Sequence, residues 1–201
     1  IISTGASPRK LKIPGEDKYF GRGISTCATC DAALFKNKTV IIVGGGDTAM
    51  EYALILAKFT DDITIIHRRD EFRASKVMQD RVLKLKNKIK VKWNSTALEV
   101  VGSNNFVKGV KIKNIKTNKE TKLNCDGIFL AIGHIPNTNS FKDIVNLDKK
   151  GYVKTDSATK TNVEGLFAAG DCQDTKYWQA VTAAGTGCIA ALEAEKYIGN
   201  L

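Results

Sequence analysis

Two cysteines separated by two residues, Cys27 and Cys30, are the side chains in this sequence whose type and spacing most directly suggest chemistry, and Asp31 follows them at once. Such a pair can be a structural crosslink, half of a metal site, or a disulfide that opens and closes. A structural zinc site needs more ligands than one such pair supplies, and the only histidines are His67 and His134. We therefore interpret the pair as a candidate for thiol–disulfide chemistry.

A glycine-rich segment, G-G-G-D-T-A at 44–49, comes soon after the cysteines. The β-branched run at 39–43 before it is typical of a buried parallel strand, and apolar residues at helical spacing continue to about Phe59. Strand, glycines and helix together predict a dinucleotide-binding unit, because the glycines permit a tight turn and a close approach of pyrophosphate. The alternative is a glycine turn without a ligand. The candidate ligand-binding residues are Gly44, Gly45, Gly46, Asp47, Thr48 and Ala49.

The next expected strand, 62–67, ends where this type of unit contacts the adenosine ribose. An NAD site would carry an acidic residue there, but this chain has a basic group instead, consisting of His67, Arg68, Arg69 and Arg73. Guanidinium groups bind a 2′-phosphate through charge-assisted hydrogen bonds. The segment therefore predicts NADPH over NADH. The alternative is a solvated basic loop in which Asp70 and Glu71 pair some of the charge.

The formal net charge of +10, from 31 basic and 21 acidic side chains, raises the question of nucleic-acid binding. Most of the excess is lysine spread singly, as between Lys108 and Lys119, with no aromatic residues interleaved to stack on bases. We interpret it as solvated surface and expect no nucleic-acid partner. We also expect no membrane association, because no apolar run approaches the length of about 18 residues that spans a bilayer.

Further elements are expected on both sides of residue 133. Before it, we predict a helix at 72–86 with Val77, Val82 and Leu83 facing inward, and a strand near 90–95. An antiparallel ribbon near 106–116 and 121–125 follows, then an apolar strand that ends at 133. Beyond it we expect an irregular connection, a strand within 165–172, and a helix at 179–198. Gly185 and Gly187 inside that helix imply either tight packing or the approach of a flat ligand.

Taken in order, the motifs resemble one family, the low-molecular-weight thioredoxin reductases. The resemblance rests on T-G-A-S at 4–7, C-A-T-C-D at 27–31, G-G-G-D-T-A at 44–49, H-R-R-D-E-F-R-A-S at 67–75, A-I-G-H-I-P-N at 131–137, and F-A-A-G-D at 167–171 with Q-A-V-T-A-A-G-T-G-C at 179–188. It implies an α/β fold in which a Rossmann-like NADPH domain, with three layers built from a parallel sheet and an antiparallel ribbon, is inserted into an FAD domain.

The expected domains are 10–132 for NADPH and the redox pair, and 1–9 with 133–201 for part of the FAD domain. The family's first segment, which carries the FAD fingerprint, is not found in this sequence, so we expect a truncated chain that binds FAD weakly by itself. The resemblance adds Ile132 and Gly133 to the NADPH site. It assigns to the FAD site Thr4, Gly5, Gly170, Asp171, Gln179 and Ala180.

The resemblance also implies a mechanism for the complete protein. Electrons pass from NADPH to FAD and then to the Cys27–Cys30 disulfide. Cys30 lies next to the flavin, Cys27 attacks the disulfide of thioredoxin, and Asp31 acts as the acid/base group. Family members are homodimers, and we expect a cytoplasmic protein.

Two residues depart from the family pattern, and other functions stay open. Trp178 stands where the family commonly has arginine, and Ala32 where it commonly has glycine, which would strain alanine if φ were positive. The alternatives are the flavoprotein subunit of an alkyl hydroperoxide reductase, and a non-catalytic NADP-binding module. A ferredoxin-driven relative is disfavoured by the arginines at 68–73.

Overall fold

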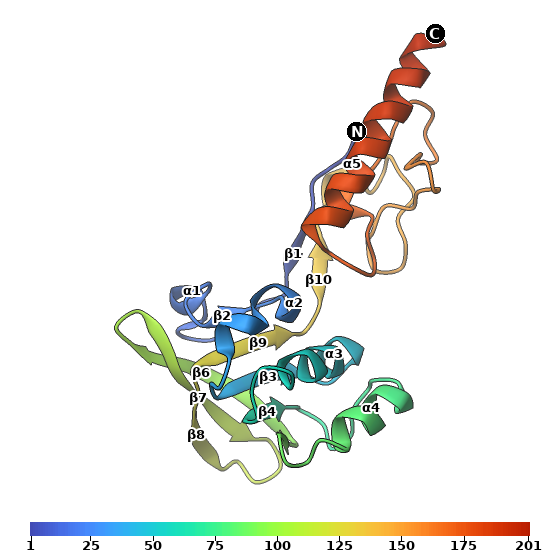
Figure 1. Cartoon of the computed structure of the whole chain (residues 1–201). Helices are drawn as coiled ribbons and strands as arrows, with labels where there is room; N and C mark the ends of the chain where they lie inside the picture. The colour runs from blue at the N-terminus through green and yellow to red at the C-terminus, as the bar shows by residue number, and fades with distance from the viewer. The chain divides into compact units, whose positions relative to one another are not determined.

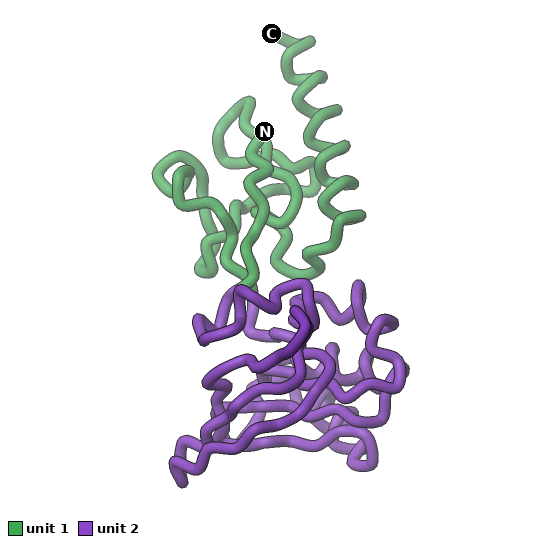
Figure 2. Tube along the Cα trace, turned by 90° about the vertical axis from the view of Figure 1, so that its left-hand side faces the viewer, with its two compact units in different colours: residues 1–8, 134–201 green, residues 9–133 purple.

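The computed structural model describes all 201 residues and divides into two compact units. Unit 1 consists of Ile1–Pro8 with His134–Leu201, and unit 2 is Arg9–Gly133 (Figure 2). Both crossings lie within one residue of the division expected from the sequence; the nucleotide that each unit binds stays a prediction. No helix in the structure has both the length and the apolar character needed to cross a bilayer.

Unit 2 is built around a five-stranded sheet in which every neighbouring pair is parallel (Figure 1). In spatial order the strands are β2 (Ile24–Ser25), β9 (Gly127–Ala131), β3 (Val40–Gly44), β4 (Ile63–Ile66) and β5 (Ile89–Lys92). The central strands are apolar along almost their whole length because the sheet is covered on both faces. Their carboxyl ends share one edge.

One face of this sheet is covered by helices. These are α2 (Ala28–Asp31), α3 (Asp47–Leu56) and α4 (Lys76–Leu83), with a 3₁₀ turn at Ala32–Phe35. Met50 and Leu56 of α3 are fully buried against Ile42, Ile65 and Phe129 of the sheet. A short helix, α1 (Glu16–Tyr19), precedes β2.

The other face is covered by an antiparallel sheet of β6 (Ser95–Ser103), β7 (Phe106–Asn114) and β8 (Glu120–Asn124). Val110 and Ile112 of β7 pack in one cluster with Ile41, Val43 and Ile128 of the parallel sheet. The three-layer α/β fold is therefore confirmed. The expected ribbon of two strands is wrong in one respect, because β6 adds a third strand. Its residues do not alternate between buried and exposed, and two bulges interrupt its register with β7.

The predicted helix at 72–86 is wrong in its start and in its inward face. The helix begins at Lys76, and of the three inward candidates Val82 is buried, whereas Val77 is 69% and Leu83 is 38% exposed. Phe72 lies in the preceding turn instead, with its ring 4.4 Å from that of Trp93. Met78, four residues before Val82, lies on the same face of the helix and packs against the core in place of Val77.

Unit 1 has little regular structure apart from its last helix. Strands β1 (Ala6–Pro8) and β10 (His134–Pro136) pair antiparallel, short 3₁₀ turns lie at Asn139–Phe141 and Gly170–Cys172, and α5 spans Ala180–Gly199. The expected strand within 165–172 is not formed as a ladder. In that segment only isolated β-bridges form, between Ile2 and Ala168 and between Lys160 and Phe167. The predicted last helix is confirmed.

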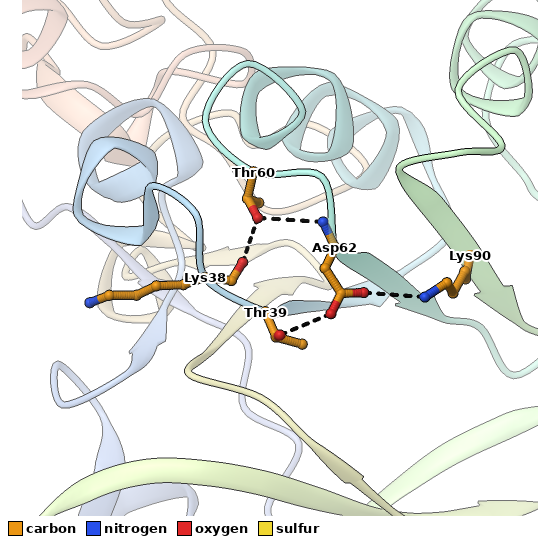
Figure 3. Close-up of polar contacts among 5 residues, drawn as sticks. All are labelled: Lys38, Thr39, Thr60, Asp62 and Lys90. Carbon is orange, nitrogen blue, oxygen red and sulfur yellow. Dashed lines mark hydrogen bonds and ion pairs between the residues drawn. The ribbon is translucent and has the colours of Figure 1, made fainter.

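A polar network ties the amino ends of the parallel strands together, at the edge opposite the glycine turn (Figure 3). The Asp62 carboxylate accepts a hydrogen bond from Thr39 Oγ1 at 2.9 Å and forms an ion pair with Lys90 Nζ at 3.4 Å. The Thr60 hydroxyl donates to the Lys38 carbonyl at 2.6 Å. These contacts help to hold β3, β4 and β5 in register.

Asp62→Ala should lower the free energy of unfolding by about 1 kcal/mol, because it removes the carboxylate that Thr39 binds. Lys90→Ala is the matched control, because it removes only an ion pair whose lysine is 67% exposed, and it should change stability by no more than about 0.5 kcal/mol. Urea unfolding followed by circular dichroism measures both. Equal losses in the two variants would contradict this division.

Candidate functional site

The two cysteines form a disulfide, with Cys27 Sγ and Cys30 Sγ 2.06 Å apart. Cys27 caps α2, and the Cys30 N–H donates to Cys27 Sγ at 3.1 Å. Of the possibilities that the spacing left open, the structure therefore has the crosslinked pair. No group of three or more His, Cys, Asp or Glu side chains is placed to hold a metal ion.

Asp31 is held beside this pair by Ser25, the last residue of β2. The Ser25 hydroxyl donates to Asp31 Oδ2 at 2.6 Å and accepts the N–H of Cys27 at 3.0 Å. Ser25 is only 7% exposed, so the contact is partly shielded from solvent. Sequence reasoning missed this residue because a serine two positions before a cysteine carries no signal of its own.

Tyr52 of α3 provides a second support, since its hydroxyl donates to the carbonyl of Thr26, directly before Cys27. Burial, with a smaller contribution from the charge of Glu51, raises the pKa of Tyr52 to about 12, so the phenol stays a hydrogen-bond donor. Sequence reasoning missed Tyr52 as well. The expected strain at Ala32 is absent, because its φ is −56°.

A cavity of about 720 Å³ lies at the carboxyl-end edge of the parallel sheet, within unit 2. The predicted residues that line it are Gly44, Gly45, Gly46, Thr48, His67, Arg68, Arg73, Ile132 and Gly133. It is also lined by residues that were not predicted, among them Arg9, Lys10, Ser95, Thr96 and Ala97. They come from segments distant in sequence, so no local motif includes them.

The glycine turn is shaped by its neighbours on two sides and is open on the third. A Cβ at Gly44 would lie 2.5 Å from the carbonyl oxygen of Ala131, and one at Gly45 would lie 2.2 Å from Nδ1 of His67. A Cβ at Gly46 would meet nothing within 4 Å. A phosphate group can therefore reach the backbone at Gly46, which is the fit that a dinucleotide requires.

Three predicted residues lie outside the cavity lining. Ala49 is fully buried, where it lets α3 pack closely on β3. Asp47 accepts hydrogen bonds from the N–H and the hydroxyl of Ser75, both at 2.8 Å. The carbonyl of Arg69 accepts the N–H of Asn94 at 3.0 Å, and its side chain is exposed.

Asp70, one of the two acids near the arginines, is engaged elsewhere. Asp70 pairs with Lys116 at 2.7 Å, which lowers the pKa of its carboxyl. No ion pair in the structure involves Arg68, Arg69 or Arg73. The alternative in which Asp70 neutralises this basic segment therefore loses support.

His67 is a buried wall of the cavity, 5% exposed. Burial lowers its pKa, a hydrogen bond between Nε2 and the Glu71 carbonyl at 3.0 Å opposes this, and the charge of Arg73 lowers it further. The ring packs near Phe72 and Trp93. His67 is therefore neutral at neutral pH and supports Gly45 through its shape.

A second cavity, of about 400 Å³, lies within unit 1. Its lining includes the predicted residues Gly5, Gly170, Asp171 and Ala180, but not Thr4 or Gln179. Burial, together with the charge of Asp174, raises the pKa of Asp171. A Cβ at Gly185 or Gly187 would meet nothing within 4 Å, so tight packing within the structure does not explain these glycines, and Gly187 faces the cavity.

Trp178, the departure from the family's arginine, is held within unit 1. Its ring stacks on that of His134, with centroids 5.0 Å apart, and its Nε1–H donates to the Tyr152 hydroxyl at 3.2 Å. Its backbone N–H donates to Asp174 at 2.9 Å. The loop before α5 is therefore fixed by stacking, where the family's arginine would offer a charge.

Comparisons with known proteins agree with these motifs. A family model described as pyridine nucleotide-disulphide oxidoreductase matches residues 1–187. The chain is 53% identical to a thioredoxin reductase of Rickettsia conorii over 203 residues, which is 100% of this chain and 65% of the relative. It is 48% identical to the mitochondrial thioredoxin reductase of Kluyveromyces lactis, covering 100% of this chain and 58% of that protein.

A solved structure has a similar fold. The crystal structure of thioredoxin reductase from Streptococcus pyogenes matches with a TM-score of 0.93 at 38% identity, covering 100% of this chain and 65% of the other. These similarities confirm the resemblance drawn from the motifs and the fold class. The chain spans less than two thirds of the length of these relatives.

The lowered pKa of His67 should make the protein less stable in mild acid. Its folded pKa lies below the ordinary 6.5, so below that pH the unfolded chain binds the proton first. The free energy of unfolding should therefore fall between about pH 7 and pH 5, and His67→Gln should reduce this fall. Urea unfolding at both pH values measures it. His134→Gln should remove a separate part of the fall in unfolding free energy, because burial lowers the pKa of His134 too. If His67→Gln left the pH dependence of the unfolding free energy unchanged, the lowered pKa could not be assigned to His67.

Proposed function

This chain belongs to the pyridine nucleotide-disulphide oxidoreductase family, and from that premise we propose that it is part of an NADPH-dependent thioredoxin-disulfide reductase. One observation carries the proposal: a single folded unit holds both the Cys27–Cys30 disulfide, followed by Asp31, and a cavity lined by the glycine turn, Arg68 and Arg73. A non-catalytic NADP-binding module has no use for the disulfide. An alkyl hydroperoxide reductase subunit shares these motifs, but the relatives named above are thioredoxin reductases.

In this proposal NADPH occupies the cavity of unit 2 and supplies a hydride. The backbone at Gly46 is open to the pyrophosphate, and the amino end of α3 points its unpaired N–H groups at the same place. Arg68, Arg69 and Arg73 bind the 2′-phosphate, and none of the three forms an ion pair with a carboxylate in the structure. Ile132 and Gly133 bound the cavity where the chain leaves the unit.

FAD, when bound, supplies a redox centre that exchanges electrons with a nicotinamide and with a disulfide. In unit 1 its contacts would come from Thr4, Gly5, Gly170, Asp171, Gln179 and Ala180. Gly5 and Gly170, at φ of +72° and +74°, provide turns that place no side chain in the cavity, and Gly187 leaves the adjoining face of α5 flat. The half-buried Asp171 carboxyl can accept hydrogen bonds from sugar hydroxyls.

The chemistry of the protein's own groups is thiol–disulfide exchange. With the pair reduced, the Cys27 thiolate attacks one sulfur of the oxidised thioredoxin disulfide, forms a mixed disulfide and displaces the other sulfur as a thiolate. The Cys30 thiolate then attacks Cys27 Sγ, which restores the Cys27–Cys30 disulfide and releases the dithiol. Two electrons pass to the substrate. Asp31, held by Ser25, exchanges protons with these thiols.

We further propose that the partner is thioredoxin, that the full-length protein is a homodimer, and that it works in the cytoplasm. Thioredoxin is taken from the names of the relatives, and the homodimer is what the resemblance of the motifs implies. The cytoplasm is proposed because thiols there are kept reduced, which suits an enzyme that delivers reducing equivalents.

Cys30→Ser in the full-length protein should abolish NADPH-dependent reduction of thioredoxin, because Cys27 would then lack the thiol that resolves the mixed disulfide. The assay follows NADPH absorbance with oxidised thioredoxin as substrate. Cys188→Ser is the matched control, since Cys188 is an exposed cysteine on α5 outside the proposed chemistry. Full activity of Cys30→Ser would refute the role given to Cys30, whereas a wild-type protein that binds NADPH but reduces no thioredoxin would leave the binding module.

Replacing Arg68 and Arg69 with alanine should raise the dissociation constant for NADP⁺ by about tenfold or more and that for NAD⁺ by less than about twofold, because only NADP⁺ carries the 2′-phosphate. Isothermal titration calorimetry on the oxidised protein measures both constants. Arg81→Ala, on the exposed face of α4, is the control. Equal effects on the two dissociation constants would show that these arginines do not bind the 2′-phosphate.

A further inference from the structure

Asp47 places a negative charge where an anionic ligand is expected to bind. It is the first residue of α3, directly after the glycine turn, where the helix end favours an anionic ligand. A carboxylate aimed at that ligand would repel its phosphates. Gly46 and Thr48 on either side of Asp47 line the cavity, whereas Asp47 does not. Its side chain is therefore engaged elsewhere.

The partner of Asp47 is Ser75, 28 residues along the chain. Asp47 Oδ1 accepts both the backbone N–H and the hydroxyl of Ser75, each at 2.8 Å. Ser75 is the residue that precedes α4 and ends the basic segment 67–75. The carboxylate thus ties the end of that segment to the start of the phosphate-binding helix.

A second tie lies two residues earlier. The N–H of Arg73 donates to the carbonyl of Gly45 at 2.7 Å, in the middle of the glycine turn. At the other end of the segment, the His67 ring lies against Gly45, where a Cβ would approach Nδ1 to 2.2 Å. The basic segment is therefore fastened to the glycine turn at its beginning and at its end.

We propose that Asp47 is a positioning residue that sets the preference for a phosphorylated dinucleotide. By holding Ser75, it fixes Arg73 and the segment before it at one distance from the glycine turn, which is the distance between 2′-phosphate and pyrophosphate on a single ligand. The arginines then meet the 2′-phosphate without first being ordered. This inference rests on the proposed function, in which that ligand is NADPH.

Three variants of the full-length oxidised protein test this, with NADP⁺ and NAD⁺ as probes in isothermal titration calorimetry. Asp47→Ala should raise the NADP⁺ dissociation constant by about tenfold and the NAD⁺ constant by less than about twofold, because two charge-assisted hydrogen bonds are lost. Asp47→Asn should keep the NADP⁺ preference, since its amide oxygen still accepts from Ser75. Ser75→Ala should fall between them, because its N–H remains.

Each other outcome overturns the inference in a recognisable way. An equal loss for both dinucleotides would make Asp47 a general scaffold residue or a direct ligand of their shared part. A gain in NADP⁺ affinity in Asp47→Ala would show that the carboxylate acts only as a repelling charge. An unchanged preference in Asp47→Ala, when the wild-type protein prefers NADP⁺, would defeat the inference alone. A wild-type protein with no such preference would defeat the NADPH assignment as well.

Discussion

The constraint on which unit 2 depends is the lack of space around the glycine turn at the end of β3. The carbonyl of Ala131 closes one side of Gly44, and the ring of His67 closes one side of Gly45. Both contacts come from neighbouring parallel strands, so the turn forms only where β9, β3 and β4 end together. Gly46 alone faces open space. The packing of the sheet edge therefore creates the place where a phosphate can reach backbone N–H groups.

Helix α3 connects this edge to the redox pair. Its amino end begins at the glycine turn, and its fully buried residues anchor it on the sheet. From the middle of α3, Tyr52 reaches the carbonyl of Thr26 beside the disulfide, and Ser25 on β2 holds Asp31. The same core that positions the cavity thus also holds the Cys27–Cys30 disulfide, so one small unit carries both parts of the proposed chemistry.

What could be predicted from the sequence was what local patterns encode. The parallel strands are apolar runs, the glycine turn is a spaced motif, and the two cysteines stand two residues apart in the sequence. Contacts between distant segments were not readable: Tyr52 and Arg9 belong to no motif. The inward face of α4 was also not identified, since Met78 rather than Val77 packs against the core. Ser75, the residue before α4, binds a carboxylate far back in the chain, which no local pattern encodes.

The acidic residues around the arginines show why net charge alone is a poor guide to this site. The chain carries an excess of ten positive charges, yet most of its lysines are scattered over exposed surface. An exposed ion pair such as Lys116–Asp70 adds little stability, about 0–1 kcal/mol. The ion pair matters instead because Lys116 offsets the negative charge of Asp70. An unpaired carboxylate within the screening length of about 8 Å would weaken the positive field of the arginines. Lys116 engages Asp70 and Ser75 engages Asp47, so both of these carboxylates have partners other than the guanidinium groups.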